Sequence, residues 1–182
     1  MPGSQETGAD LDVGELISSA IRDIPDYPQP GVVFKDITPL LADAAAFAAV
    51  VRALAGSAGP VDKVAGIEAR GFILAAPVAC KLGAGFVPVR KQGKLPGPTH
   101  RQSYQLEYGS AAVEIHTDAL APGDRVLIID DVLATGGTAA ATAELVRRAG
   151  ARIAAVSVLL ELSFLHGRDR LDGLDVRSLL VV

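Results

Sequence analysis

Two adjacent carboxylates followed by a small, glycine-rich turn are the residues of this sequence most suited to chemistry. Asp130 and Asp131 follow the apolar run VLII, and the turn ATGGT occupies residues 134–138. In an open α/β sheet, ligands bind beyond the carboxyl ends of the strands. We therefore expect both acids at a ligand-binding edge of the sheet.

The turn itself predicts an anion site. It leads into a predicted helix, so the backbone N–H groups of residues 135–138 can converge on one anion, reinforced by the helix dipole and the Thr hydroxyls. Gly136 and Gly137 allow a close approach that a Cβ would block. A Walker A loop is excluded because the lysine and the longer glycine spacing are missing, and no G-x-G-x-x-G fingerprint occurs.

Paired acids beside a phosphate site suit a sugar phosphate, because carboxylates accept hydrogen bonds from vicinal hydroxyls. The alternative is a strand that ends in solvated Asp residues before an ordinary helix N-cap. The residues by themselves leave both interpretations open.

Composition restricts the class of protein. The chain has 182 residues, 49% of them hydrophobic, and a net charge of -4, which favours a globular protein and argues against nucleic acid as a partner. The single cysteine, Cys80, excludes an intramolecular disulfide framework, and we expect it to be a small core residue. We find neither a signal-peptide pattern nor a membrane-length apolar run, so the sequence predicts a cytoplasmic protein without a membrane partner.

The elements that must position the site alternate between strands and helices. This order predicts an α/β fold, a mostly parallel twisted sheet with helices on both faces. We expect a mobile tail over 1–10 and a single domain over 11–182. Helices are predicted over 11–22, 43–55, 71–82 and 138–149, strands over 61–69, 83–89, 125–131, 153–160 and 176–180, a short helical segment near Arg168, and an antiparallel hairpin from 104–109 and 111–117.

Two segments have no such periodicity. Three prolines within residues 25–30 forbid a regular helix there. Residues 90–103 combine Gly, Pro and charge, which predicts a long exposed loop. Arg90, Lys91 and Lys94 make this loop the densest basic cluster, and the alternatives are a solvated loop or a lid that closes over an anionic substrate.

The segment VLIIDDVLATGGT resembles the signature of the type I phosphoribosyltransferases. In that family it binds the ribose hydroxyls and the 5'-phosphate of phosphoribosyl pyrophosphate. Three further segments resemble the adenine-specific branch of the family: DYPQPGVVFKDITPLL, GIEARGFILAAPVA, and VPVRKQGKLPGPT together with YQLEYG. The resemblance runs from about Ile21 to Leu162.

The resemblance implies that adenine and phosphoribosyl pyrophosphate react to give AMP and pyrophosphate in purine salvage, with Mg²⁺ as cofactor. It implies the type I phosphoribosyltransferase fold, with an N-terminal hood over 11–40, a mobile catalytic loop over 90–103, and a homodimer in which Arg90 acts across the interface. Mg²⁺ is expected to be held mainly by pyrophosphate and water, without a cage of protein ligands. The phosphoribosyl pyrophosphate residues implied are Arg70, Arg90, Lys91, Lys94, Tyr108, Ala134, Thr135, Gly136, Gly137 and Thr138.

Catalytic roles fall to Asp130, Asp131, Arg70, Lys91 and Glu107. Arg70 lies between a strand and a helix, where its guanidinium can donate to the oxygens of pyrophosphate. The alternative is a surface salt bridge. Glu107 on the hairpin could take the proton that adenine loses at N9, or could be a solvated strand residue.

Val33, Phe34 and Lys35 are the predicted adenine-binding residues. A backbone C=O and N–H on neighbouring residues can read the N6 donor and N1 acceptor of adenine, while Phe34 stacks on the ring. Core packing of Val33 and Phe34 is the alternative. Two rival functions remain: transfer to another purine or pyrimidine, and a non-catalytic sensor of phosphoribosyl pyrophosphate.

Overall fold

The computed structural model describes residues 12–56, 58–105 and 109–182. The chain divides into two compact units, Met1–Ala49 and Val50–Val182, and each is considered by itself. Within the described ranges, no helix has the length and apolar character that a membrane crossing needs.

The first unit is built around a two-stranded hairpin. Opposite charges face each other across its antiparallel strands, with Arg22 beside Asp36 and Lys35 beside Asp23, each pair 2.8 Å apart. Such cross-strand pairs help to hold strands that are too short to be stable alone. Its elements are α1 (Val13–Ala20), β1 (Arg22–Pro25), β2 (Val33–Asp36), α2 (Thr38–Ala42) and the start of α3 (Ala44–Gly56).

The hairpin and α2 were not predicted from the sequence. The prolines do exclude a helix over 25–30, as expected, but they occupy the end of β1 and the loop that follows it. Pro39 stands in the first turn of α2, where its missing N–H costs no helical hydrogen bond.

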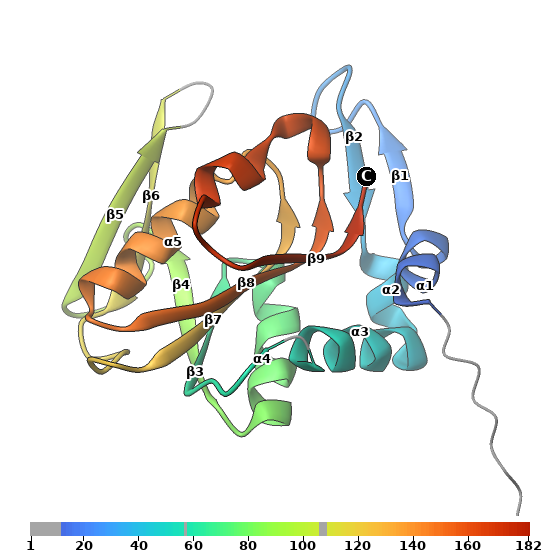
Figure 1. The fold of residues 1–182 in the computed structure, drawn as a ribbon. Helices are drawn as coiled ribbons and strands as arrows, with labels where there is room; N and C mark the ends of the chain where they lie inside the picture. The colour runs from blue at the N-terminus through green and yellow to red at the C-terminus, as the bar shows by residue number, and fades with distance from the viewer. Residues whose placement is uncertain (1–11, 57, 106–108) are drawn as a thin grey trace, which may run out of the picture. The chain divides into compact units, whose positions relative to one another are not determined.

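The second unit contains a seven-stranded sheet of order β5-β6-β4-β3-β7-β8-β9 (Figure 1). Five neighbouring strands are parallel, and β5 and β6 form an antiparallel hairpin at one end. Its elements are β3 (Lys63–Ile67), α4 (Arg70–Leu82), β4 (Gly85–Lys91), β5 (Thr99–Gln105), β6 (Ser110–His116), β7 (Arg125–Leu133), α5 (Gly137–Arg148), β8 (Arg152–Glu161), the 3₁₀ turns η1 (Ser163–Leu165) and η2 (Gly167–Leu171), and β9 (Val176–Val181).

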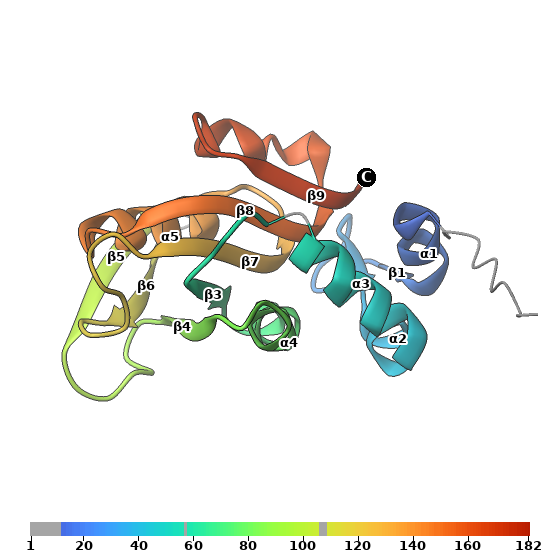
Figure 2. The same ribbon diagram turned by 60° about the horizontal axis from the view of Figure 1, so that its bottom comes forward.

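Helices cover both faces of this sheet, as predicted. Ala65 and Ile67 of β3 belong to the buried cluster that includes Leu145 of α5. Gly66, between them, faces the other side, where Ala75 of α4 packs. In the view of Figure 2, α4 lies below β7 and β8, while β9 runs beside β8 after the two 3₁₀ turns.

One prediction in this region is wrong. Cys80, expected to be a core residue, is exposed on α4. The helix buries Leu74, Ala75, Val78 and Ala79 against the sheet. Cys80 is next to Ala79 in the chain but lies about 100° further round the helix, which turns its side chain away from that stripe.

The close packing of α4 on β3 requires glycine at position 66. A Cβ there would lie 2.7 Å from the Cβ of Ala75 and 2.8 Å from the ring of Phe86. We predict that Gly66→Ala lowers the free energy of unfolding by about 1–3 kcal/mol, because the added methyl overpacks a buried contact. Chemical denaturation measures this loss.

Gly56→Ala is the matched control. Nothing lies within 4 Å of a Cβ at Gly56, which is the last residue of α3. Its free energy of unfolding should not decrease, and equal destabilisation of the two variants would contradict the packing argument.

Candidate active site

The candidate site lies where the chain connections leave the sheet in opposite directions. β3 and β7 are neighbours, but α4 leads from β3 to β4 on one side and α5 leads from β7 to β8 on the other. Such a divergence leaves a crevice at the carboxyl ends of the two strands, where ligands bind in open α/β sheets. A cavity of about 290 Å³ opens there, and its lining comprises Ile67, Glu68, Ala69, Arg70, Lys91, Tyr104, Val113, Asp130, Asp131 and Thr138.

The two carboxylates belong to the end of β7. The strand continues to Leu133, two residues beyond its predicted end, so both acids lie within the strand. The side chain of Asp130 turns back and accepts a hydrogen bond of 2.9 Å from the backbone N–H of Asp131. The helix α4 also approaches Asp130 closely, because a Cβ on Gly71 would lie 2.9 Å from the side-chain atom Asp130 Oδ1 and 3.2 Å from the Cα of Asp130.

Asp131 forms an ion pair with Arg70. The distance from Arg70 Nε to Asp131 Oδ2 is 2.7 Å, and only 6% of Asp131 is exposed. From the sequence, we expect these side chains to bind different parts of a ligand, Arg70 the pyrophosphate and Asp131 the ribose. The structure brings them together, and those assignments stay predictions.

Asp130 is in an environment that opposes its ionisation. Burial raises its pKa well above the ordinary value, and the neighbouring carboxylate of Asp131 raises it further. The N–H of Asp131 and the cation of Arg70 act in the opposite direction without offsetting the rise. A ligand that donates hydrogen bonds to the Asp130 carboxylate would therefore relieve a cost present in the protein alone.

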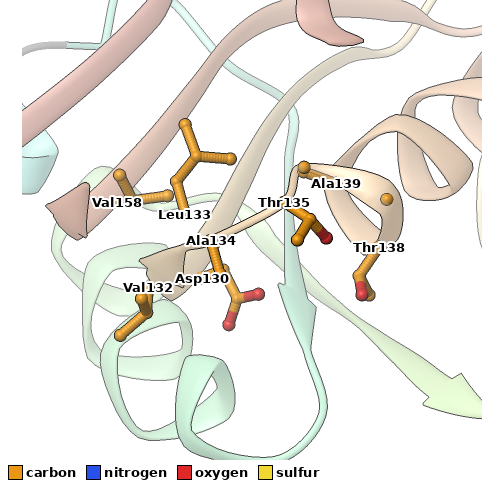
Figure 3. Close-up of a pocket in the computed structure, with 10 residues that line it drawn as sticks. Asp130, Val132, Leu133, Ala134, Thr135, Thr138, Ala139 and Val158 are labelled. Atoms are coloured by element: carbon orange, nitrogen blue, oxygen red, sulfur yellow. The ribbon is translucent and has the colours of Figure 1, made fainter. Parts of the chain in front are cut away.

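The turn after β7, which the sequence predicts to bind an anion, surrounds a small hollow. A hollow of about 70 Å³ is lined by residues 132–139 together with Asp130 and Val158. Figure 3 shows Asp130 at the strand end, with Thr135 and Thr138 on the turn beside it. Gly136 is the N-cap of α5 in the left-handed region, at φ 77°, and Gly137 begins the helix. A helix N-terminus of this kind presents N–H groups to an anion.

Tyr104 is a site residue that the sequence analysis missed. The hydroxyl of Thr138 donates to the Tyr104 hydroxyl at 3.1 Å, across 34 residues of sequence. The ring also contacts Gly137, since a Cβ there would lie 3.0 Å from Tyr104 Cδ2. No local signal marks Tyr104, because its role depends on β5 lying beside the start of α5.

Glu68 is a second site residue that was not predicted, and its carboxylate contacts all three residues of the basic cluster. Its carboxylate accepts hydrogen bonds from Lys94 Nζ at 2.5 Å, from the Lys91 backbone N–H at 3.0 Å and from Arg90 Nε at 3.3 Å. Burial favours the protonated acid, but these donors together outweigh it and hold the pKa of Glu68 below its ordinary value. The cations of Arg90 and Lys94 are thus paired within the chain.

The predicted mobile loop over 90–103 is shorter in the structure. Residues 90 and 91 complete β4, and Thr99–Gln105 form β5, which pairs with β6 from Thr99↔His116 to Gln105↔Ser110. The prediction was wrong for these residues because Thr99, Arg101 and Ser103 give a polar alternating strand that is recognisable only beside its partner. The connection that remains contains Gly93 and Gly97, both in the left-handed region.

Glu107 and Tyr108, predicted as proton acceptor and phosphoribosyl pyrophosphate ligand, lie outside the described residues. An antiparallel hairpin in this region is confirmed by the pairing of β5 with β6.

The predicted base-reading residues belong to β2 of the first unit. Val33 is 49% exposed, so it is not a core residue in this structure. The rings of Phe34 and Tyr27 meet edge to face, with centroids 5.2 Å apart. Lys35 is paired with Asp23.

Comparison with known proteins agrees with this architecture. The model of the phosphoribosyl transferase domain matches residues 34–179. An adenine phosphoribosyltransferase of Acidothermus cellulolyticus is 65% identical over 173 residues, which are 94% of this chain and 98% of the relative. Another, from Frankia casuarinae, is 61% identical and covers 98% of this chain and 96% of its own.

Solved structures give the same result at the level of the fold. The adenine phosphoribosyltransferase of Thermoanaerobacter pseudethanolicus superimposes with a TM-score of 0.89 at 50% identity, covering 92% of this chain and 99% of its own. The mixed seven-stranded sheet with its N-terminal hairpin is therefore the type I phosphoribosyltransferase fold. Because the match extends over nearly the whole length of the curated relatives, this chain belongs to the phosphoribosyltransferase family and, within it, to the adenine phosphoribosyltransferases.

Proposed function

We propose that this chain transfers the 5-phosphoribosyl group of phosphoribosyl pyrophosphate to adenine, releasing AMP and pyrophosphate. The observation that carries the proposal is the acid pair at the end of β7, placed between a phosphate-sized turn and Arg70 at the adjacent strand end. Two relatives support the choice of base. The yeast enzyme, 36% identical, was solved with adenine and an imino-altritol bisphosphate, and the Giardia lamblia enzyme, 39% identical, with 9-deazaadenine.

The parts of the sugar phosphate have separate partners in this proposal. The turn 134–138 holds the 5'-phosphate, and Asp130 and Asp131 accept hydrogen bonds from the ribose hydroxyls. Negative charge near the anomeric carbon favours the cation-like path by which the bond to pyrophosphate breaks. Arg70 and Lys91, which line the larger cavity, stabilise the departing pyrophosphate.

The base is read, we propose, by Val33, Phe34 and Lys35. Adenine offers an N6 donor beside an N1 acceptor, the reverse of the pattern on hypoxanthine and guanine. Glu107 remains our proposed acceptor for the N9 proton. The expected cytoplasmic location also stays a prediction.

The carboxylates of the cavity fit a Mg²⁺ ion that arrives with the pyrophosphate group of phosphoribosyl pyrophosphate. Among the described residues, no three His, Cys, Asp or Glu side chains gather closely enough to hold a metal. Asp130 and Asp131 nevertheless offer the hard oxygen donors that Mg²⁺ prefers, and this ion usually keeps several waters. When bound, it would neutralise charge on the pyrophosphate.

Base specificity tests the function directly. With phosphoribosyl pyrophosphate and Mg²⁺, we predict rapid formation of AMP from adenine and much slower formation of IMP, GMP and OMP, because a mismatched base edge leaves buried groups unpaired at about 1–3 kcal/mol each. Chromatography of parallel reactions measures the four products.

Two results would contradict this prediction. Faster formation of IMP, GMP or OMP than of AMP would exclude the adenine assignment. Binding of phosphoribosyl pyrophosphate without any nucleotide product would favour the sensor function instead.

Asp130→Asn should separate stability from activity. Because its pKa is raised in the folded protein, ionised Asp130 destabilises the folded state. This loss of stability begins as the pH rises above the pKa of an unfolded Asp, about 3.9. Its full size is about 1.4 kcal/mol for each unit by which folding raises the pKa. We predict a variant that is more stable than the wild type at neutral pH, with an advantage that shrinks on acidification, and an activity reduced about 10²–10³-fold. Denaturation at several pH values and an AMP assay measure the two effects.

Asp62→Asn is the matched control, and we expect it to change stability in the opposite direction. Asp62 accepts three hydrogen bonds from Arg125, which hold its pKa well below the ordinary value. Its contribution to stability is present above the unfolded pKa and is lost as pH falls through the lower folded value. This variant should be less stable than the wild type at neutral pH and fully active, whereas a destabilised Asp130→Asn would refute the proposed environment of Asp130.

The dimer that the resemblance implies is also a proposal. In the single chain, Arg90 donates to Glu68 and, at 3.1 Å, to the carbonyl of Lys94, so reaching a neighbouring site requires these contacts to break. If Arg90 acts across the interface, mixing inactive Arg90→Ala and Asp130→Asn subunits restores about a quarter of the wild-type activity, since half of the random dimers have one intact site. An AMP assay after subunit exchange that shows no recovery would place Arg90 in its own chain's site.

A further inference from the structure

The phosphate turn is supported from behind by the backbone of a distant segment. A Cβ on Gly136 would lie 2.2 Å from the carbonyl oxygen of Gly167, and a Cβ on Gly167 would lie 2.1 Å from the carbonyl oxygen of Ala134. The same Cβ on Gly167 would be 2.9 Å from the backbone nitrogen of Gly136. Two stretches of main chain therefore touch without any side chain between them.

The requirement for glycine differs between the two positions. Gly136 has φ 77°, a conformation that other residues rarely adopt, so both its backbone and its surroundings call for glycine. Gly167 is not among the glycines with positive φ and could accept a side chain as far as its own backbone is concerned. A Cβ at position 167 is excluded only because Ala134 and Gly136 lie so close. Glycine is therefore required at this position by its contact with the turn.

Arg168 fixes Gly167 in this place. Its guanidinium donates to Glu161 from Nε at 2.9 Å and from Nη2 at 2.5 Å, to the Val176 carbonyl at 2.7 Å and to Ser178 Oγ at 3.2 Å. Glu161 ends β8 and is 7% exposed, and Arg168 is the main cause of its lowered pKa. The residue after Gly167 is thus tied to two strands of the sheet.

We propose that Gly167 is a positioning residue for the 5'-phosphate, and that Arg168 and Glu161 hold it against the turn 134–136. This inference rests on the proposed role of the turn as the phosphate site. Gly167 does not touch the ligand. It keeps the carbonyl of Ala134 and the nitrogen of Gly136 in place, and with them the direction of the N–H groups that follow, because a shifted turn would no longer converge on one anion.

The test is binding of two anions that occupy different parts of the site. For Gly167→Ala, the dissociation constant of ribose 5-phosphate should rise about 10–100-fold, since a displacement of about 1 Å is enough for such a loss. That of pyrophosphate with Mg²⁺ should not change, because its proposed partners, Arg70 and Lys91, belong to other elements. Calorimetric titration of the full-length protein gives both dissociation constants. The KM for phosphoribosyl pyrophosphate should rise together with the dissociation constant of ribose 5-phosphate.

Arg168→Lys is a second variant in case the alanine protein does not fold. Lysine keeps the charge but cannot make the forked contact with Glu161. Ribose 5-phosphate should bind more weakly than to the wild type, and pyrophosphate equally well. Unchanged ribose 5-phosphate affinity in this variant would overturn the proposal.

Gly173→Ala is the matched control for strain in the same segment. Gly173 has φ 75°, yet nothing lies within 4 Å of a Cβ there. The melting temperature should fall because of backbone strain, while the ribose 5-phosphate affinity stays at the wild-type value. If Gly167→Ala weakens both anions equally, its effect is general destabilisation and the positioning role is refuted.

Thr138→Ala separates this inference from the proposed site. If Thr138→Ala binds ribose 5-phosphate as well as the wild type does, the turn is not the phosphate site. If Thr138→Ala binds weakly and Gly167→Ala binds normally, the turn holds the phosphate without help from Gly167, and only the present inference fails.

Discussion

The ion pair between Arg70 and Asp131 joins the carboxyl ends of two neighbouring strands, and the geometry of the site depends on it. The cation stands beside a buried strand end where burial and the Asp131 carboxylate raise the pKa of Asp130, and Arg70 acts against that rise. Arg70 begins α4, and Gly71 lets that helix approach the backbone of Asp130. The divergence of the connections after β3 and β7 makes the approach possible.

The position of Asp130 has a cost for the folded protein. Burial and the neighbouring Asp131 carboxylate raise the pKa of Asp130, so its charge is costly for the protein alone, and in the proposed function the hydroxyls of a bound sugar donate to it. At the opposite ends of the same two strands, Asp62 and Arg125 form a pair whose geometry lowers the pKa of the acid and stabilises the fold. The same residue type therefore has opposite effects on stability at the two ends of the sheet.

Contacts with distant segments help to shape the turn 134–138, which we propose as the phosphate site. Gly136 meets Gly167, and Gly137 meets the ring of Tyr104, so the turn is enclosed by η2 on one side and by β5 on another. The basic cluster is organised in a similar way, since Glu68 at the end of β3 collects Arg90 and Lys94. An anionic ligand that recruits these cations has to compete with Glu68.

Local pattern was enough to predict the glycine-rich turn before a helix, the two carboxylates at a strand end, the helices on both faces and the mostly parallel sheet, because these features follow from residues close together in the chain. Three features were not predicted: the hairpin of β1 and β2, the early start of β5 and the exposure of Cys80. The first two depend on pairing with a partner strand, and the third depends on which side of α4 packs against the sheet. The sequence by itself determined which chemical groups are available and at which strand ends they stand. Only the tertiary structure decided that Arg70 pairs with Asp131, that Tyr104 meets Thr138 and that Gly167 supports Gly136, because each contact joins residues brought together by the order of strands in the sheet.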